Sequence, residues 1–257
     1  MFPAEISQQP LPFLESVGTV FARFGADTQD SGNISYGLRA GDARYFVKTA
    51  GDPADTKAYF DLGGRIALLR NAVELAESVV HPALPVLHAV IESPGGPLLA
   101  YEWRDGDLLS IRCAAHERFR ALPVAEIRSA LDSLYGLHAD LDAAGWVEGD
   151  FYDGAMMYDF PARRLTVMDL DTYRRGPHRN DMGRMFGSTR FMAPEQHSLG
   201  APIDTRTTAY VLARAALVLM PDPPAPLYSV LQEATTTRFP SYSAFYDAWL
   251  AASATAP

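Results

Sequence analysis

The chain has 257 residues, of which 48% are hydrophobic and 21% charged, with 31 acidic side chains against 22 basic ones. This composition supports one large domain or two smaller lobes with packed cores, and it excludes disorder over most of the length. The formal net charge of -9 argues against nucleic acid as the main partner, because binding to phosphates needs a basic face. Only Lys48 and Lys57 among the basic residues are lysines. A lysine therefore merits attention, since arginine does not replace its compact charge at every site.

Cysteine content and hydropathy indicate the compartment. The chain has one cysteine, Cys113, so an intramolecular disulfide and a thiolate metal cluster are both excluded. The first residues lack a basic segment followed by an apolar one, and no apolar stretch approaches the roughly 18 residues that a membrane span needs. We expect a cytoplasmic protein without a membrane anchor.

The first hundred residues predict a small sheet with one helix. Residues 18–50 form three short segments with partial alternation, separated by Gly, Asp and Asn, which is typical of an antiparallel meander. Apolar residues then recur at three- and four-residue steps over 54–80, which predicts a helix that ends before Pro82. Two further strands are expected over 84–93 and 96–103. Five strands and one helix make a small α+β lobe.

The remaining residues predict a mainly helical lobe. Helical spacing covers 124–143, and short strand and loop segments follow over 147–159 and 164–171. Helices are expected again over 205–219 and 241–252, with a short one between them after a proline-rich stretch. The predicted fold class is therefore α+β with two lobes, residues 1–103 and 104–257.

Four polar positions stand out by their order and spacing. Lys48 ends the third strand, Asp150 follows a long helix and a short strand, and Asp169 comes 19 residues later at the end of another strand. The decapeptide GSTRFMAPEQ at 187–196 follows, with Glu195 in its Ala-Pro-Glu triplet. This series resembles the protein-kinase superfamily over nearly the whole chain, and the decapeptide is similar to the end of a protein-kinase activation segment. The resemblance implies a protein-kinase-like fold with a trimmed second lobe.

The resemblance implies a role for three of these side chains. Phosphoryl transfer needs a cation near the phosphates, a carboxylate for magnesium and an acceptor at the attacking hydroxyl. Lys48 would be the cation, Asp169 the magnesium ligand and Asp150 the catalytic base. Each has a structural alternative: a solvated strand-end lysine, a turn former and a loop cap, respectively.

The nucleotide would be held by backbone and side-chain groups of both lobes. Ser31, Gly32 and Asn33 replace the three spaced glycines of protein kinases and are similar to the shorter phosphate loops of aminoglycoside-phosphotransferase-like kinases. An ordinary hairpin turn explains these three residues nearly as well. By resemblance, backbone groups of Glu102 and Arg104 would pair with adenine. Asp107 would reach the ribose hydroxyls, with a solvated loop acid as an equal interpretation.

The chain departs from the protein-kinase pattern around the metal site and in the first helix. Ala155 stands where the second magnesium ligand, an Asn, is expected, and Asp153 is a candidate to replace it, or the first corner of a turn. The magnesium triplet ends in Asp171 instead of glycine, which makes Asp171 a second metal ligand or a turn acid. Ala72 occupies the position of the helix glutamate that pairs with the lysine in protein kinases. Glu74 lies about 200° away around the helix, so it is poorly placed to replace that glutamate.

A structural mark of the superfamily is retained near the end of the chain. The segment ATTTRFPSYSAFYDAW at 234–249 is similar to the last protein-kinase helix. The resemblance implies a buried ion pair between Glu195 and Arg238, which would stabilise the larger lobe.

These features favour an ATP- and Mg²⁺-dependent phosphotransferase that transfers the γ-phosphoryl group to a Ser/Thr hydroxyl. The Glu-Gly-Asp sequence at 148–150 and the trimmed second lobe favour a small-molecule alcohol as the acceptor instead. A third hypothesis is a pseudokinase that binds a nucleotide or a partner without turnover, which Ala155 and the missing helix glutamate support. Neither nucleic acid nor a membrane is an expected partner.

Overall fold

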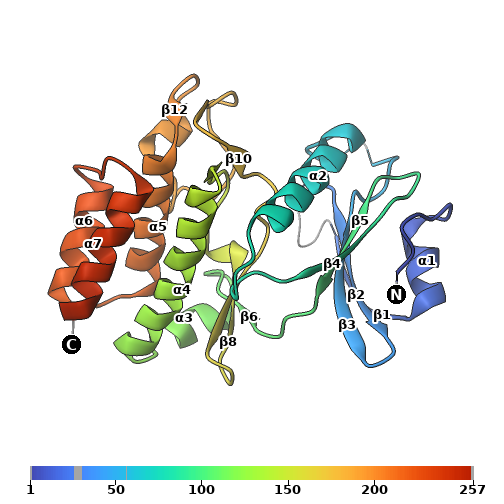
Figure 1. The fold of residues 1–257 in the computed structure, drawn as a ribbon, viewed down its shortest axis with the longest axis horizontal. Coiled ribbons are helices and arrows are strands. Elements are labelled where there is room, and N and C mark those ends of the chain that lie inside the picture. Colours follow the sequence, from blue (N-terminus) through green and yellow to red (C-terminus); the bar gives the residue numbers. More distant parts are fainter. Residues whose placement is uncertain (1, 26–30, 56, 256–257) are drawn as a thin grey trace. The chain divides into compact units, whose positions relative to one another are not determined.

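The computed structural model describes residues 2–25, 31–55 and 57–255 (Figure 1). The chain divides into two compact units. The first comprises Met1–Val80 and Pro85–Arg104, and the second comprises His81–Leu84 and Asp105–Pro257. The architecture is α+β, as the sequence predicts.

The first unit is built on a five-stranded antiparallel sheet with the strand order β1-β2-β3-β5-β4. The strands are β1 (Thr19–Phe24), β2 (Ile34–Ala40), β3 (Ala43–Thr49), β4 (Leu87–Ile91) and β5 (Leu98–Glu102). All five lie within the segments that the sequence predicts as strands. The predicted meander of the first three strands is confirmed, because β2 pairs with both β1 and β3.

Two helices cover opposite faces of this sheet, so the prediction of a single helix in the unit is wrong (Figure 1). On one face, Phe13 and Leu14 of α1 (Pro10–Val17) pack against alternate residues of β2, β3 and β5. On the other face, Leu69 and Ala72 of α2 (Leu62–Ser78) pack against Leu99. Short length conceals α1 in the sequence, since eight residues span barely two turns.

The helix predicted over 54–80 begins only at Leu62. The carboxylates of Asp52 and Asp55 each accept a hydrogen bond from a backbone N–H two residues later, which stabilises turns in place of a helix. Asp61 then caps α2 by accepting a hydrogen bond of 2.7 Å from the Gly64 N–H. The carboxylates that precede α2 thus set its start.

The residues before α1 pair with the outer edge of the sheet. The N–H of Ile6 donates to the Glu92 carbonyl, and the N–H of Glu92 donates to the Ala4 carbonyl, both at 2.8 Å. These bonds form a parallel bridge beside the end of β4. Ile6 is buried in the same cluster as α1, so the segment is part of the packed unit.

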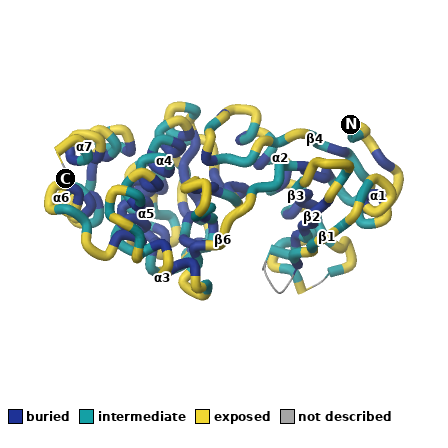
Figure 2. Tube along the Cα trace, turned by 90° about the horizontal axis from the view of Figure 1, so that it is seen from below, coloured by how far each residue is buried: buried dark blue, intermediate teal, exposed yellow. Residues whose placement is uncertain are grey.

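The second unit contains α3 (Ala114–Arg120), α4 (Val124–Ala143), α5 (Thr205–Leu219), α6 (Ala225–Thr235) and α7 (Tyr242–Thr255). The predicted helices at 124–143 and 205–219 are confirmed at both ends. Nine residues of α5 are buried, which makes it the central helix of the unit, and Figure 2 shows this burial along its trace. In the core, Tyr135 of α4 stacks edge-on against Trp249 of α7 at 4.7 Å between ring centroids.

Short strands carry the loops of the second unit. A three-stranded sheet joins β6 (Asp107–Leu108), β8 (Met156–Asp159) and β9 (Arg164–Val167). Two-stranded pairs join β7 (Trp146–Val147) to β10 (Arg174–Arg175) and β11 (His178–Arg179) to β12 (Pro202–Ile203). The 3-10 helices η1 (Asp153–Ala155) and η2 (Pro194–His197) lie in the connections. These short elements fix the loops that hold the predicted acidic residues.

Within the described ranges, no helix combines the length and the apolar character that a membrane crossing requires.

Candidate functional site

Lys48 lies in β3 on the face of the sheet that α2 covers. Its direct cross-strand neighbours are Ser35 of β2 and Leu99 of β5. Cross-strand neighbours share a face, and Leu99 packs against α2, so Lys48 points to that side. The lysine is only 8% exposed. A buried lysine is uncommon, and this burial argues against the interpretation as a solvated strand end.

The predicted phosphate loop, Ser31–Asn33, is described in full, whereas Asp30, the residue before it in the sequence, lies outside the described residues. Gly32 has a φ of +87°, and a Cβ at this position would approach the Cβ of Ala58 to 2.3 Å. Glycine is therefore required here for both conformation and space. Asn33 is buried, and its side-chain amide donates a hydrogen bond of 3.0 Å to the Thr49 carbonyl. This bond ties the loop to the residue after Lys48.

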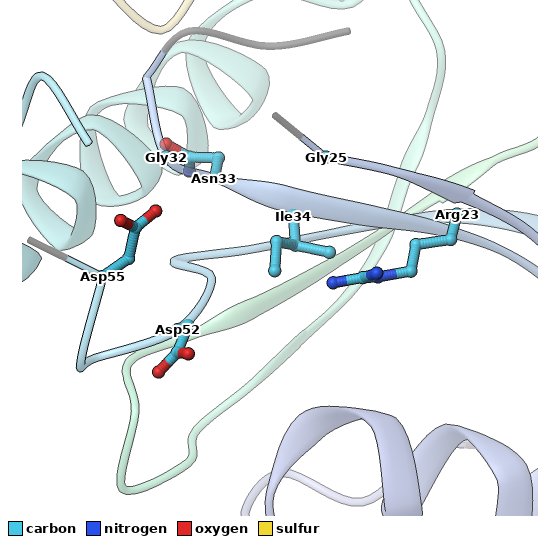
Figure 3. A pocket seen from close by; sticks show the side chains of 7 residues that line it. All are labelled: Arg23, Gly25, Gly32, Asn33, Ile34, Asp52 and Asp55. Atoms are coloured by element: carbon cyan, nitrogen blue, oxygen red, sulfur yellow. The ribbon is translucent and has the colours of Figure 1, made fainter. Parts of the chain in front are cut away.

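A pocket of about 580 Å³ lies at this end of the first unit (Figure 3). Gly32 and Asn33 form part of its wall, as does Asp52 from the connection after β3. The other lining residues are Arg23, Gly25, Ile34 and Asp55. Two of the three predicted loop residues thus border a cavity, and the polar groups around it carry both signs of charge.

The residues predicted to contact adenine and ribose fall in different units. The carboxylate of Glu102 accepts a hydrogen bond of 2.9 Å from the Val86 N–H and forms an ion pair with Arg104. Its own backbone N–H donates to the Val86 carbonyl. Glu102 and Arg104 belong to the first unit. Asp107 lies in β6 of the second unit, where its carboxylate pairs with the Arg118 guanidinium at 3.7 Å. The Asp107–Arg118 pair is exposed and contributes little stability.

Asp150 and Asp169 lie near each other in the second unit. Burial and, to a smaller extent, the Asp169 carboxylate raise the pKa of Asp150 to about 7, while the Arg184 guanidinium acts in the opposite direction. Oδ1 of Asp150 is buried and has no hydrogen-bond partner among the described residues. Asp169 has a φ of +62°, a conformation that few residues other than glycine adopt and that is common at functional sites.

The predicted activation segment passes directly beside Asp150. Gly187 has a φ of +110°, and a Cβ there would lie 3.0 Å from Oδ1 of Asp150. The Arg184 side chain donates to the Gly187 carbonyl at 3.1 Å, which places its charge near the same carboxylate. The decapeptide and the two aspartates, which are far apart in sequence, are therefore neighbours in the fold.

Asp153 is engaged in a way that the sequence did not reveal. It is 1% exposed, and its Oδ2 accepts hydrogen bonds from the Ile111 N–H at 2.9 Å and from Arg190 at 2.8 Å. A guanidinium at this distance would repel a cation. The geometry thus argues against Asp153 as a magnesium ligand and favours a structural role in the loop.

Of the other two predicted magnesium ligands, Asp169 and Asp171, only Asp169 is exposed. Over the described stretches of the chain, no three His, Cys, Asp or Glu side chains cluster as metal ligands. Magnesium bound with a nucleotide needs only one or two carboxylates, because phosphates and waters complete its shell. The Asp169 carboxylate, exposed beside Asp150, has the chemistry for this. Asp171 is only 9% exposed and less suited to it.

A buried polar network, which the sequence did not predict, supports the loop that carries Asp150. Glu148 is fully buried and accepts hydrogen bonds from Gln196 at 2.8 Å and from the Phe151 N–H at 3.3 Å. Its backbone N–H donates to the hydroxyl of Thr208 at the start of α5. Burial raises the pKa of Glu148 to about 8. The hydroxyl of Thr208 thus connects the start of α5 to the loop.

The predicted ion pair between Glu195 and Arg238 is present, but it is only partly buried, with side-chain exposures of 17% and 24%. The guanidinium donates to both carboxylate oxygens, at 2.7 and 3.1 Å, and the hydroxyl of Thr207 adds a third hydrogen bond at 2.7 Å. The pair joins η2 to the segment before α7, across 43 residues of sequence. Parallel bonds of this kind are the strongest form of such contacts.

A comparison of the chain with models of protein families found no match, and neither did a comparison with curated protein sequences.

Proposed function

We propose that the protein is an ATP- and Mg²⁺-dependent phosphotransferase that acts on an alcohol hydroxyl. One observation carries the proposal: Asp150 has a buried, unpartnered carboxylate oxygen beside Asp169 and the segment at 184–187. A buried acceptor without a partner is costly in a fold, and such groups are typical of catalytic sites. The order of the residues in the sequence points to the same chemistry.

In the proposed reaction, Asp150 accepts the proton of the attacking hydroxyl. The hydroxyl oxygen forms a bond to the γ-phosphorus of ATP, and the bond from that phosphorus to the bridging oxygen of ADP breaks. A base with a pKa near 7 suits this step, because about half of it is ionised at neutral pH and it still holds a proton after transfer. Lys48 would pair with the phosphates of the nucleotide, and Asp169 would hold the metal.

Magnesium supplies neutralisation of the phosphate charge when it is bound. The chain contributes the geometry: Glu148, Thr208 and Gln196 hold the loop of Asp150, and Gly187 permits the close approach of the activation segment. Preorganised groups of this kind account for much of the catalysis in phosphoryl transfer. The acceptor we favour is a Ser/Thr hydroxyl, since the GSTRFMAPEQ segment is similar to that of protein kinases. A small alcohol is the alternative.

A second function, nucleotide binding without turnover, rests on a separate observation. The carboxylate closest in sequence to Ala155 is Asp153, and it is already bound to Arg190 and the Ile111 N–H. Asp153 is therefore not available to replace the second magnesium ligand of protein kinases. A pseudokinase would bind ATP and release no ADP.

The test compares the full-length wild type with Asp150→Asn and with Asp222→Asn, an exposed acidic residue in the second unit. ADP release is measured with ATP and Mg²⁺ on panels of peptides and small alcohols. We expect acceptor-dependent release that falls by about a hundredfold or more in Asp150→Asn and is unchanged in Asp222→Asn. Equal background rates in all three proteins would contradict the enzyme hypothesis. A rise in melting temperature with ATP would then support the binding function.

A further inference from the structure

Arg65 of α2 is a buried cation at the centre of the predicted phosphate-binding end of the first unit. Its exposure is 0%. The guanidinium donates to the carbonyls of Gly32 at 2.9 Å, Ala50 at 2.7 Å and Asp52 at 3.0 Å, and Nε donates to the Asp61 carbonyl at 3.4 Å. Arginine is rarely buried to this extent, so the arrangement calls for a reason.

The four carbonyls come from three separate segments. Gly32 belongs to the predicted phosphate loop, Ala50 and Asp52 follow β3, and Asp61 caps α2. Ala50 is two residues after Lys48. Arg65 therefore links the helix, the strand end of the lysine and the loop through one rigid planar group. Gly32 and Asp52 also line the pocket of Figure 3, so the same side chain fixes two parts of its wall.

The charge of Arg65 has no carboxylate partner among the described residues, because all its hydrogen bonds there go to backbone carbonyls. Carbonyl dipoles compensate a buried guanidinium only in part. The guanidinium lies at the carbonyls of Gly32, Ala50 and Asp52, so its charge is close to the loop and to the end of β3. A buried guanidinium that only carbonyl dipoles compensate favours an anion bound close to it.

We infer that Arg65 positions the loop Ser31–Asn33 for the phosphates of the nucleotide, a role that rests on the proposed function. In the protein-kinase pattern, a glutamate of this helix pairs with the lysine. The corresponding residue here is Ala72, which is buried in the apolar cluster with Leu69 and Leu99. Arg65 joins the helix to the loop by another route, through backbone carbonyls. It is a positioning residue, since its donors contact the protein and not the substrate.

The test uses the full chain with Arg65→Lys and Arg65→Met. The control is Arg70→Lys, on the same helix, whose ion pair with Glu92 is nearly half exposed and lies away from the loop. The first measurement is amide hydrogen exchange of the unliganded proteins. Arg65→Met should exchange faster over residues 31–37 and 49–55, while residues 124–143 of the second unit stay protected. Arg70→Lys should match the wild type in the loop.

The second measurement compares MgATP, adenosine and inorganic tripolyphosphate as ligands by calorimetry. In Arg65→Lys, which retains the charge but loses the planar fork, MgATP and tripolyphosphate should bind about tenfold more weakly, because several hydrogen bonds that hold the loop are lost. Adenosine should bind as it does to the wild type. In turnover, the KM for ATP should rise while kcat changes little.

Three outcomes would overturn the inference. They are unchanged exchange in the loop, equal weakening of adenosine and MgATP, and unchanged binding of tripolyphosphate. A wild type that binds tripolyphosphate but not MgATP contradicts the proposed function alone, because the phosphate site is then present without a nucleotide site. A wild type that binds neither contradicts both.

Discussion

The side-chain amide of Gln196 donates a hydrogen bond of 2.8 Å to the buried carboxylate of Glu148. Gln196 lies in η2, and Glu148 lies two residues before Asp150. The other end of the amide, Oε1 of Gln196, accepts from the Ala193 N–H, also at 2.8 Å. One glutamine thus connects the end of the predicted activation segment to the loop of the proposed base.

Removal of this amide should destabilise the second unit. Gln196→Ala leaves a buried carboxylate oxygen and a buried N–H without partners, and we expect a loss of about 2 kcal/mol in the free energy of unfolding. The control is Gln232→Ala, at an exposed position in α6, which should change stability by less than about 0.5 kcal/mol. Urea unfolding measures both. Similar stabilities for the two variants would show that the Glu148–Gln196 contact is dispensable.

Asp153 should prove to be a structural residue. Asp153→Ala leaves the Arg190 guanidinium and the Ile111 N–H without their acceptor. Arg190 is one-third exposed, so water compensates in part, and we expect a loss of about 2 kcal/mol in the free energy of unfolding. The Mg²⁺ concentration that supports half-maximal ATP binding should not change. A large increase in that concentration, without loss of stability, would restore the prediction that Asp153 is a metal ligand.

The ion pair of Glu195 and Arg238 should show a strong coupling. Burial alone would raise the pKa of Glu195, but the hydrogen bonds from Arg238 and Thr207 outweigh it and hold that pKa below its usual range. The depressed pKa means that this stabilisation is present above the pKa of the unfolded state and is lost as the pH falls below it. A double-mutant cycle with Glu195→Gln and Arg238→Met should give a coupling energy of about 1–3 kcal/mol at pH 7. Additive losses would contradict the pairing.

The buried ring of His138 should contribute to the dependence of stability on pH. Nδ1 donates to the Leu134 carbonyl at 2.9 Å, so Nε2 accepts from the Tyr173 hydroxyl at 2.8 Å, and the ring is neutral. Burial lowers the pKa of His138 to about 4. Between that value and the ordinary pKa near 6.5, the unfolded chain binds more protons than the folded one. The contribution of His138 to stability should therefore fall as the pH decreases through this window.

The loss should reach about 3 kcal/mol at the acid end, from the size of the pKa shift. His138→Gln should lack this contribution, so the free energy of unfolding of the wild type should fall relative to that of the variant as the pH is lowered from 7 to 4, with chemical denaturation as the measurement. His197→Gln, at an exposed position, controls for the substitution itself. An identical pH dependence in wild type and His138→Gln would refute the assignment of a neutral buried ring.

The strands and long helices could be predicted because the periodicity of their apolar residues extends over the whole element. The alternation around β2 and β3 and the apolar spacing of α4 extend over seven to twenty residues each. The spacing over 54–80 continues into a segment where Asp52 and Asp55 form turns, so the predicted start of α2 was wrong. Turn-forming carboxylates compete with a helix, and apolar periodicity does not report that competition.

The residues of the candidate site could be predicted only where they belong to a series of motifs with a characteristic order and spacing. The positions of Asp150 and Asp169, and the Glu195–Arg238 pair, follow from a motif series. The partner of Asp153 does not, because Arg190 is 37 residues away and no local pattern links the two. Arg65 was missed for a similar reason: one arginine in an amphipathic helix looks the same in sequence whether it is solvated or buried.

The parallel bridge of Glu5 with Glu92 has a consequence for self-association. A sheet edge presents unpaired backbone donors and acceptors that can pair with the edge of another chain. Residues 4–6 cover part of this edge at β4, and in the described residues the opposite edge is β1, whose register shifts between Val20 and Ala22. A shift of this kind twists a strand and makes it a poor template. Loss of the segment before α1 would therefore leave β4 as the edge more prone to aggregation.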